Sequence, residues 1–330
     1  MATLETQQLD EIIVNSRRKM LALGGAALAG LAFAGVKAGL AQSSTSYTDA
    51  DILNFALNLE YLEAQFYTLA TTGKTIDELG IGIGGGTSSS GGGAVTTKPG
   101  GPSACLVPWT IASVQAYATE TAKEERNHVS FLRGALGSAA VAQPPLDLYN
   151  SFNTLASVAG IASTFDPFAN DADFLVGAFI FEDVGVTAYS GAAPLITTPA
   201  NLTAAAGILA VEAYHAGLIR STIYGLDPTG KLGLQGDTQK IAATRMILDG
   251  SSTVDDIGVG FQTVSVEPTG TTLEASTVVD AQTGSPNYSK AYSRTTTQVL
   301  KIVTGSSNLQ PSGTKYKGVF FPSGLNGLFS

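Results

Sequence analysis

The sequence predicts an all-α core: a four-helix bundle with one long crossover, followed by an irregular C-terminal extension with a short helix. Four long segments place apolar residues at helical spacing between helix start and stop signals. A long link, residues 138–169, joins the second and third segments, whereas only a few residues join the third and fourth. The two histidines of the chain occupy matching positions in the second and fourth segments. These features together indicate four helices packed around one shared site.

Each predicted helix begins at a residue that favours a helix N-terminus and ends at a glycine. The four helices are predicted from Thr48 to Gly73, from Pro108 to Gly137, from Asn170 to Gly191 and from Thr198 to Gly225. They lie in the middle of three predicted regions: an export signal over residues 1–41, the bundle over residues 42–225 and the extension over residues 226–330.

The connecting segments differ in character. Residues 80–101 hold ten of the chain's 38 glycines, which predicts a flexible surface insertion rather than regular structure. In the extension, short helices are predicted over residues 238–249 and 295–303. Residues 251–288, rich in Thr, Ser, Val and Gly, are predicted as loop with short strands, and the apolar tail over residues 318–327 is expected to pack on the bundle.

The N-terminus has the features of an export signal. Arg17 and Arg18 directly precede an apolar run over residues 20–36, and small residues follow as far as Ala41. The paired arginines resemble a twin-arginine signal, a route that exports folded proteins, and the run is short for a membrane-spanning helix. We therefore expect an exported protein, periplasmic or extracellular, with no stable membrane span after cleavage. An uncleaved N-terminal anchor is the alternative.

Composition excludes several classes of function. The chain has 27 acidic and 18 basic residues, a net charge of −9, so it lacks the excess of Lys and Arg that nucleic-acid binding requires. Its single cysteine, Cys105, rules out an internal disulfide framework and cysteine-based zinc or iron–sulfur sites, and is expected to be an inert thiol. In the glycine-rich insertion no glycine is followed by the lysine and the helix start of a phosphate-binding loop.

Both histidines follow a glutamate by three residues, in the pairs Glu125/His128 and Glu212/His215. Residues three apart share a helix face, so each pair can direct two ligands at one point. The apolar residues around Glu125 and His128 follow spacings of three and four, which puts the pair on the buried side of its helix. Because an unpaired buried carboxylate is costly, this position favours a metal site.

The first and third helices offer carboxylates in matching surroundings. Glu60 is followed after seven residues by Tyr67, and Glu182 after seven residues by Tyr189. The chain therefore resembles two helix pairs related by an internal repeat.

Two further glutamates leave alternatives open. Glu63 lies on the same buried side as Glu60, but its equivalent in the repeat is Gly185, so we favour Glu60 as the ligand and keep Glu63 as an alternative. Glu120 and Glu124 are expected to be solvated, although Glu124 lies one turn before His128 and could compete with Glu125.

Four carboxylates and two imidazoles from four helices are the ligand set of a carboxylate-bridged pair of divalent metal ions, Fe or Mn. In this arrangement Glu125 and Glu212 bridge the ions, and Glu60 and Glu182 are terminal ligands. Tyr67 and Tyr189 are expected to hydrogen-bond the metal-binding carboxylates. The predicted ligands are Glu60, Glu125, His128, Glu182, Glu212 and His215.

At these residues the sequence resembles the ferritin-like superfamily and, more narrowly, bacterial proteins related to plant desiccation-associated proteins. The resemblance rests on residues 54–67 (NFALNLEYLEAQFY), 124–133 (EERNHVSFLR), 181–189 (FEDVGVTAY), 211–220 (VEAYHAGLIR) and 318–327 (GVFFPSGLNG). It implies a di-iron or di-manganese site and a role in stress protection. The glycine-rich insertion is foreign to compact ferritins and argues against a closed storage cage.

The sequence thus leads to an exported dimetal protein that handles small oxygen species or metal ions, in oxidative or desiccation stress. Whether it is an enzyme, a dimetal oxidoreductase reactive with peroxide or oxygen, stays open at this point, as does its oligomeric state. A structural or surface-interaction protein that uses the bundle as a scaffold is the alternative. Iron storage would require a large hollow assembly.

Overall fold

The computed structural model describes residues 47–251, 256–266, 271–276, 291, 293–309 and 315–328. The predicted export signal over residues 1–41 lies outside the described residues, as do parts of the Thr/Ser-rich stretch in the extension.

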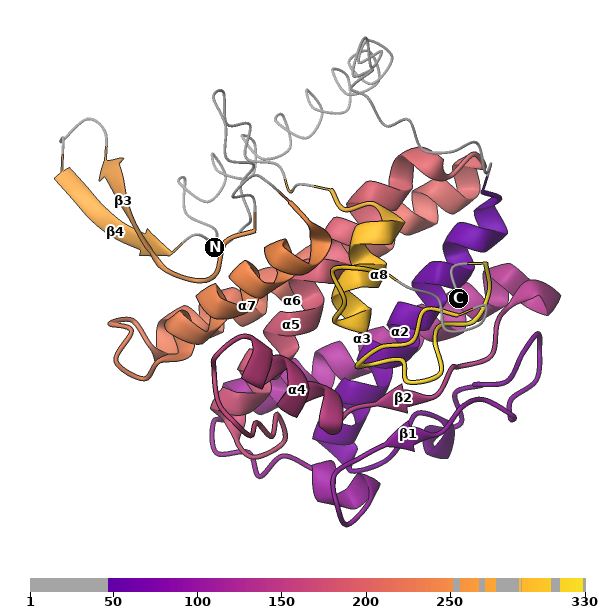
Figure 1. Ribbon diagram of the computed structural model, residues 1–330, viewed down its shortest axis with the longest axis horizontal. Helices are drawn as coiled ribbons and strands as arrows, with labels where there is room; N and C mark the ends of the chain where they lie inside the picture. Colours follow the sequence, from indigo (N-terminus) through magenta and orange to yellow (C-terminus); the bar gives the residue numbers. More distant parts are fainter. Residues whose placement is uncertain are drawn as a thin grey trace, which may run out of the picture. The chain divides into compact units, whose positions relative to one another are not determined.

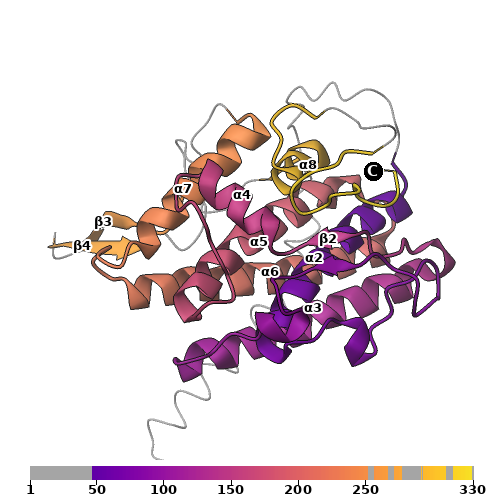
Figure 2. The same ribbon diagram turned by 60° about the horizontal axis from the view of Figure 1, so that its bottom comes forward.

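Four long helices make up the bundle: α2 (Asp49–Thr72), α3 (Ala112–Leu136), α5 (Asp171–Ala192) and α6 (Pro199–Leu226). Helix α2 packs along α3 and α5 packs along α6, so the bundle consists of two helix pairs (Figures 1 and 2). The long connection between α3 and α5 is the predicted crossover, and it contains β2 (Leu146–Asp147) and α4 (Asn150–Val158). The predicted all-α bundle with one long crossover is confirmed.

The remaining described elements lie in the connections and in the C-terminal extension. The extension holds α7 (Leu234–Asp249), the antiparallel hairpin β3 (Phe261–Val266) and β4 (Thr271–Ser276), and α8 (Thr296–Thr304). Strand β1 (Val95–Thr96) pairs in parallel with β2. Single 3₁₀ turns occur at Asp77–Leu79, Pro102–Cys105, Gly137–Ala139 and Ala193–Leu195.

One helix boundary differs from the sequence prediction because of a distant contact. Helix α3 begins at Ala112 rather than Pro108, since the carboxylate of Asp171 accepts the backbone N–H groups of Thr110 at 2.9 Å and Ile111 at 3.1 Å. This carboxylate satisfies N–H groups that would otherwise need another partner near the helix start. Helix α4, in the crossover, was not predicted.

The starts of α2 and α6 are tied together by Asp49. Its carboxylate accepts hydrogen bonds from the backbone N–H groups of Thr197 at 2.8 Å and Thr198 at 3.0 Å. These bonds hold the pKa of Asp49 well below its usual range. The first residue of one helix pair thus caps the second helix of the other pair.

The glycine-rich insertion is held in place by Arg133 of α3. The guanidinium donates to the carbonyl oxygens of Gly84 at 2.6 Å, Gly86 at 3.0 Å and Ser88 at 2.7 Å, and to the hydroxyl of Tyr61 at 2.6 Å. Where the sequence predicted a flexible segment, the structure has a loop with defined backbone contacts.

Buried ion pairs join the C-terminal extension to the bundle. Arg245 of α7 bonds Asp183 of α5 at 2.9 Å and Asp256 at 2.7 Å. Arg294 bonds Asp256 as well. Arg220 of α6 also bonds Asp183, at 2.7 Å. These side chains are almost completely buried, so their charges are matched within the protein rather than by water.

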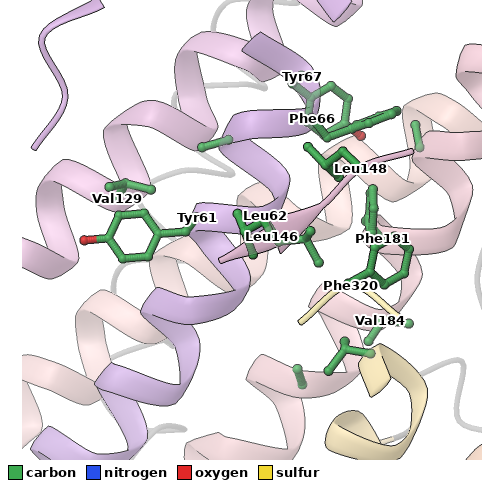
Figure 3. Close-up of a cluster of buried hydrophobic side chains, with 14 of the residues drawn as sticks. Tyr61, Leu62, Phe66, Tyr67, Val129, Leu146, Leu148, Phe181, Val184 and Phe320 are labelled. Carbon is green, nitrogen blue, oxygen red and sulfur yellow. The ribbon is translucent and has the colours of Figure 1, made fainter. Parts of the chain in front are cut away.

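The tail of the extension adds apolar contacts to the same side of the bundle. The Phe320 ring lies 5.1 Å from that of Phe181 on α5 and 5.4 Å from that of Phe152 on α4. Figure 3 shows Phe320 beside Phe181 and Val184 in the buried cluster. The tail is therefore part of the core.

By length and composition, two described helices could cross a membrane: α5 with its following turn, and α6. The apolar window of α5 is 89% buried inside the protein, as expected for the core helix of a bundle. The corresponding window of α6 is 33% buried.

Candidate metal centre

The structure brings all six predicted ligands, and also Glu63, to one place at the centre of the bundle. Each of the seven side chains belongs to a buried residue, and the most exposed, His128, has only 8% of its surface accessible. The seven residues are Glu60 and Glu63 on α2, Glu125 and His128 on α3, Glu182 on α5, and Glu212 and His215 on α6.

His128 marks one end of the cluster. Its Nδ1 lies 3.2 Å from Oε2 of Glu60, 3.5 Å from Oε2 of Glu125 and 3.5 Å from Oε1 of Glu212. Ligand atoms of these four residues all lie within 4.8 Å of one another, close enough to hold one cation.

His215 marks the other end. Its Nδ1 lies 3.0 Å from Oε1 of Glu125 and 3.4 Å from Oε2 of Glu182, and these three residues form a second group with the same spacing. Because Glu125 contributes to both groups, it lies where a bridging carboxylate belongs. The two imidazole ring centres are 6.3 Å apart.

Glu124 has a role that the sequence prediction missed. Its Oε2 lies 2.7 Å from Nε2 of His215, the ring nitrogen opposite the one that faces Glu125 and Glu182. Glu124 therefore neither competes with Glu125 nor projects freely into solvent. It fixes the orientation of the imidazole, as carboxylates commonly do behind a metal-binding histidine. Glu120 instead accepts a hydrogen bond from the exposed Tyr214.

Glu63 forms a third group, with Glu182 and Glu212. Its equivalent in the repeat, Gly185 on α5, lies against the same side chains: an added Cβ there would be 2.1 Å from Oε2 of Glu212 and 3.5 Å from Oε1 of Glu63. The missing side chain at Gly185 thus provides the space that the Glu63 and Glu212 carboxylates use. Glu60 and Glu63 both reach the cluster, so the structure keeps Glu63 as a further ligand candidate.

The two tyrosines bond the cluster crosswise. The hydroxyl of Tyr67 on α2 donates to Oε1 of Glu182 on α5, and that of Tyr189 on α5 donates to Oε1 of Glu60 on α2. Burial and the nearby carboxylates raise the pKa of both phenols well above the usual range, so both stay protonated as donors. Each helix pair therefore orients a carboxylate of the other.

Several buried polar atoms of the cluster make no hydrogen bond of good geometry within the described part of the chain, although Nδ1 of His215 and Oε1 of Glu125 lie 3.0 Å apart. They are both carboxylate oxygens of Glu125, both of Glu212, Oε2 of Glu182 and Nδ1 of His215. Buried polar groups are normally satisfied, so atoms of this kind converging on one point indicate a missing partner. Carboxylate oxygens and imidazole nitrogen are suitable donors for Fe or Mn, and the cluster is compatible with a metal site.

The acid–base properties of the cluster fit the same view. Burial raises the pKa of Glu60 to about 7 and those of Glu63 and Glu212 well above the usual range. Burial also acts to lower the pKa of His128, but Glu60 and Glu125 outweigh it and raise that pKa to about 12. Without a cation, imidazolium groups and carboxyl protons thus balance the carboxylate charge, and cations would replace these protons.

Comparison with known proteins identifies the family of the chain. The model of a family described as "ferritin-like domain" matches residues 48–225, from the cap of α2 to within one residue of the end of α6. The chain belongs to the ferritin-like domain family. This ferritin-like domain contains all seven residues of the cluster, together with Glu124 and the two tyrosines.

Two curated proteins are similar to this ferritin-like chain. The desiccation-related protein PCC13-62 from Craterostigma plantagineum is 32% identical over 223 residues, covering 64% of this chain and 66% of that protein, just under two thirds. The ferritin-like catalase Nec2 from Nesocodon mauritianus is 23% identical over 289 residues, covering 84% of each chain. No solved structure matches the chain with comparable significance. The resemblance to the ferritin-like superfamily and to desiccation proteins is confirmed.

Proposed function

We propose that this chain is an exported ferritin-like protein that binds two divalent metal ions, Fe or Mn, and uses them to break down peroxide under oxidative or desiccation stress. The observation that carries the proposal is the pair of ligand groups that share Glu125, together with their unpartnered buried atoms. Two groups with one histidine each correspond to two ions rather than one.

The residues divide into ligands and side chains that orient them. Glu60 and His128 would hold one ion, Glu182 and His215 the other, and Glu125 and Glu212 would bridge them. When bound, such a pair supplies two one-electron changes, enough to reduce one peroxide to two waters and to oxidise a second to dioxygen. The chain itself fixes His215 through Glu124 and the terminal carboxylates through the tyrosine hydroxyls.

The stress role and the export step have separate support. The relatives are named as a desiccation-related protein and a ferritin-like catalase, and the second name makes peroxide the substrate of choice. Export is supported by Arg17 and Arg18 before the apolar run over residues 20–36.

Metal analysis of natively exported protein, combined with measurement of oxygen evolution from hydrogen peroxide, tests the proposal. We expect about two Fe or Mn ions per chain, as in carboxylate-bridged bundle sites, with oxygen released on addition of peroxide. The double variant His128→Ala/His215→Ala should lose both properties. Glu120→Gln, a change on the exposed side of the same helix as His128, should keep them.

Folded wild-type protein that stays metal-free after loading with both Fe and Mn would refute the metal site. Protein that holds two ions per chain but leaves peroxide unchanged would refute the catalytic part alone.

A structural or surface-interaction role is a second candidate, favoured by the outer side of α6. The ionisable side chains of Glu212, His215 and Arg220 on that helix are all buried, whereas Leu202 and Tyr214 are exposed. An in vivo phenotype that is preserved in the His128→Ala/His215→Ala variant would favour this role over catalysis.

A further inference from the structure

An apolar cavity of about 40 Å³ lies between α2 and α5. Its walls are aliphatic and aromatic, with Phe55 and Leu59 from α2 and Ile180 and Val184 from α5. Ile302 of α8 and Phe320 of the tail also line it, so the C-terminal extension supplies part of the wall. Figure 3 shows Phe320 and Val184 close together on this side of α5.

The cavity reaches the metal cluster at the point where the internal repeat is broken. Glu63, Gly185 and Tyr189 all line it. Glu63 belongs to the ligand group with Glu182 and Glu212, and Tyr189 donates its hydroxyl to Glu60. Because Gly185 has no side chain, no Cβ separates the cavity from the Glu212 carboxylate. The apolar space therefore ends directly at candidate ligands.

Size and polarity restrict what the cavity can hold. A volume of about 40 Å³ exceeds the roughly 10–15 Å³ that one water molecule needs, so a diatomic molecule fits. Water and peroxide would lose hydrogen bonds on entering a wall of this composition, and small apolar cavities commonly stay dry. A small apolar molecule suffers no such loss.

We propose that this cavity is a docking site for dioxygen beside the metal cluster. The inference rests on the proposed function, in which dioxygen is the product. One hydrogen peroxide accepts two electrons and two protons to give two waters, and a second gives up the same two electrons and two protons to become dioxygen. The apolar product can then pass from the polar cluster into this cavity, whose largely apolar walls hold water poorly.

A second cavity in the structure provides a matched control. It has a volume of about 30 Å³, lies around α4, α5 and α7, and is lined by apolar residues that include Ala156 and again Phe320. Unlike the first cavity, it is lined by no residue of the metal cluster. Replacing an alanine by leucine in each cavity therefore compares two similar changes, of which only one fills a cavity that borders the metal cluster.

Xenon, an apolar probe that enters dry cavities, tests the docking site in crystals of the full-length protein, without added metal. We expect a xenon atom between α2 and α5 in the wild type. The change Ala188→Leu, from the α5 wall, should abolish this xenon, and Ala156→Leu should retain it. If Ala188→Leu does not fold, Ala56→Leu fills the same cavity from α2.

Metal-loaded protein links the cavity to turnover. Ala188→Leu should lower the rate of oxygen evolution at least threefold with unchanged metal content, and Ala156→Leu should leave it as in the wild type. Ordered water in place of xenon in the wild-type cavity would overturn the proposal. Equal rates of oxygen evolution in wild type and Ala188→Leu would also overturn the docking site. In that case the proposed function would still stand, because the wild-type protein would hold metal and be active. Xenon binding in protein that never holds metal would refute the proposed function instead.

Discussion

At the scale of single residues, Gly185 is the position on which the geometry of the cluster depends most directly. The internal repeat gives each helix pair a glutamate and a tyrosine at matching positions. Gly185 stands at the position that corresponds to Glu63, so the second pair has a hydrogen atom where the first has a carboxylate side chain. Its neighbours are the carboxylates of Glu212 and Glu63, which belong to one ligand group with Glu182. A methyl group at this position competes directly with the Glu212 carboxylate, which would bridge the two ions in the proposed site.

We therefore expect Gly185→Ala to lower the metal content at least tenfold, because its Cβ would lie 2.1 Å from Oε2 of Glu212. Metal analysis after loading measures the effect. Gly207→Ala is the control, since Gly207 lies on the exposed side of α6 with no atom within 4 Å of an added Cβ. That change should keep the metal and stabilise the helix by about 0.5–1 kcal/mol. Equal metal content in the two variants would contradict the prediction.

Which site residues could be predicted from the sequence depends on how far apart their partners lie. Glu125 and His128 are one helical turn apart, so their spacing alone places them on one face. Glu124 and His215 are 91 residues apart, and no spacing rule relates them. The crosswise bonds of Tyr67 and Tyr189 are likewise set by how the two helix pairs dock, although the tyrosines themselves were identified by the repeat.

At the scale of secondary-structure elements, the sequence predicted helix ends correctly where neighbouring residues determine them. It did not predict those that depend on contacts with residues far along the chain. Helix α2 has a complete capping box, in which Thr48 and Asp51 bond each other's backbone N–H groups, and it begins where predicted. Helix α3 begins late because Asp171, on another helix, binds Thr110 and Ile111. The glycine-rich insertion is fixed by Arg133, which local composition cannot reveal.

The ion pairs around Asp256 hold the elements of the extension to the bundle. We expect Asp256→Asn to lower the free energy of unfolding by up to about 3–5 kcal/mol at pH 7. The change takes one of two carboxylates from each buried guanidinium and leaves Arg245 with Asp183 and Arg294 with Asp249. Urea unfolding measures the change. Asp237→Asn, which removes the half-buried partner of the exposed Lys240, should cost about 0–1 kcal/mol.

The same ion pairs have a defined pH dependence. Burial acts to raise the pKa of Asp256, but Arg245 and Arg294 outweigh it and lower that pKa below its usual 3.8. A carboxyl with a depressed folded-state pKa stabilises the protein above its unfolded-state value, and this contribution disappears as the pH falls through the folded-state value. The difference between wild type and Asp256→Asn should therefore shrink below about pH 4. A difference that is constant down to pH 2 would contradict this account.

At the scale of the whole molecule, the charge of the buried cluster couples metal binding to protons. In the metal-free protein His128 has a pKa of about 12, and Glu63 and Glu212 have pKa values well above the usual range. Between pH 6.5 and 9 the folded metal-free protein thus binds more protons than the unfolded chain, so its stability falls as the pH rises. Each such proton contributes at most about 1.4 kcal/mol per pH unit.

Metal binding should remove this dependence, because cations displace the same protons. We expect the free energy of unfolding of metal-free protein to fall between pH 6.5 and 9, with a flatter profile after loading with Mn²⁺. Urea unfolding at several pH values measures both profiles, and calorimetry in buffers of different ionisation enthalpy counts the protons released. Parallel profiles and no proton release would contradict the linkage. The variant His128→Ala/His215→Ala should show little response to the metal.

The crossed tyrosines bear on how such a chain could arise. A helix pair made of α2 and α3 carries Glu60 but not the hydroxyl that orients it, and the pair made of α5 and α6 carries Glu182 without its own donor. Each helix pair obtains the tyrosine hydroxyl for its glutamate only when it packs against the other pair. The bundle therefore has the form expected of two joined copies of one helix hairpin, related by the exchange of the two tyrosine hydroxyls. Once joined, the copies could diverge, and Glu63 opposite Gly185 is a place where they did.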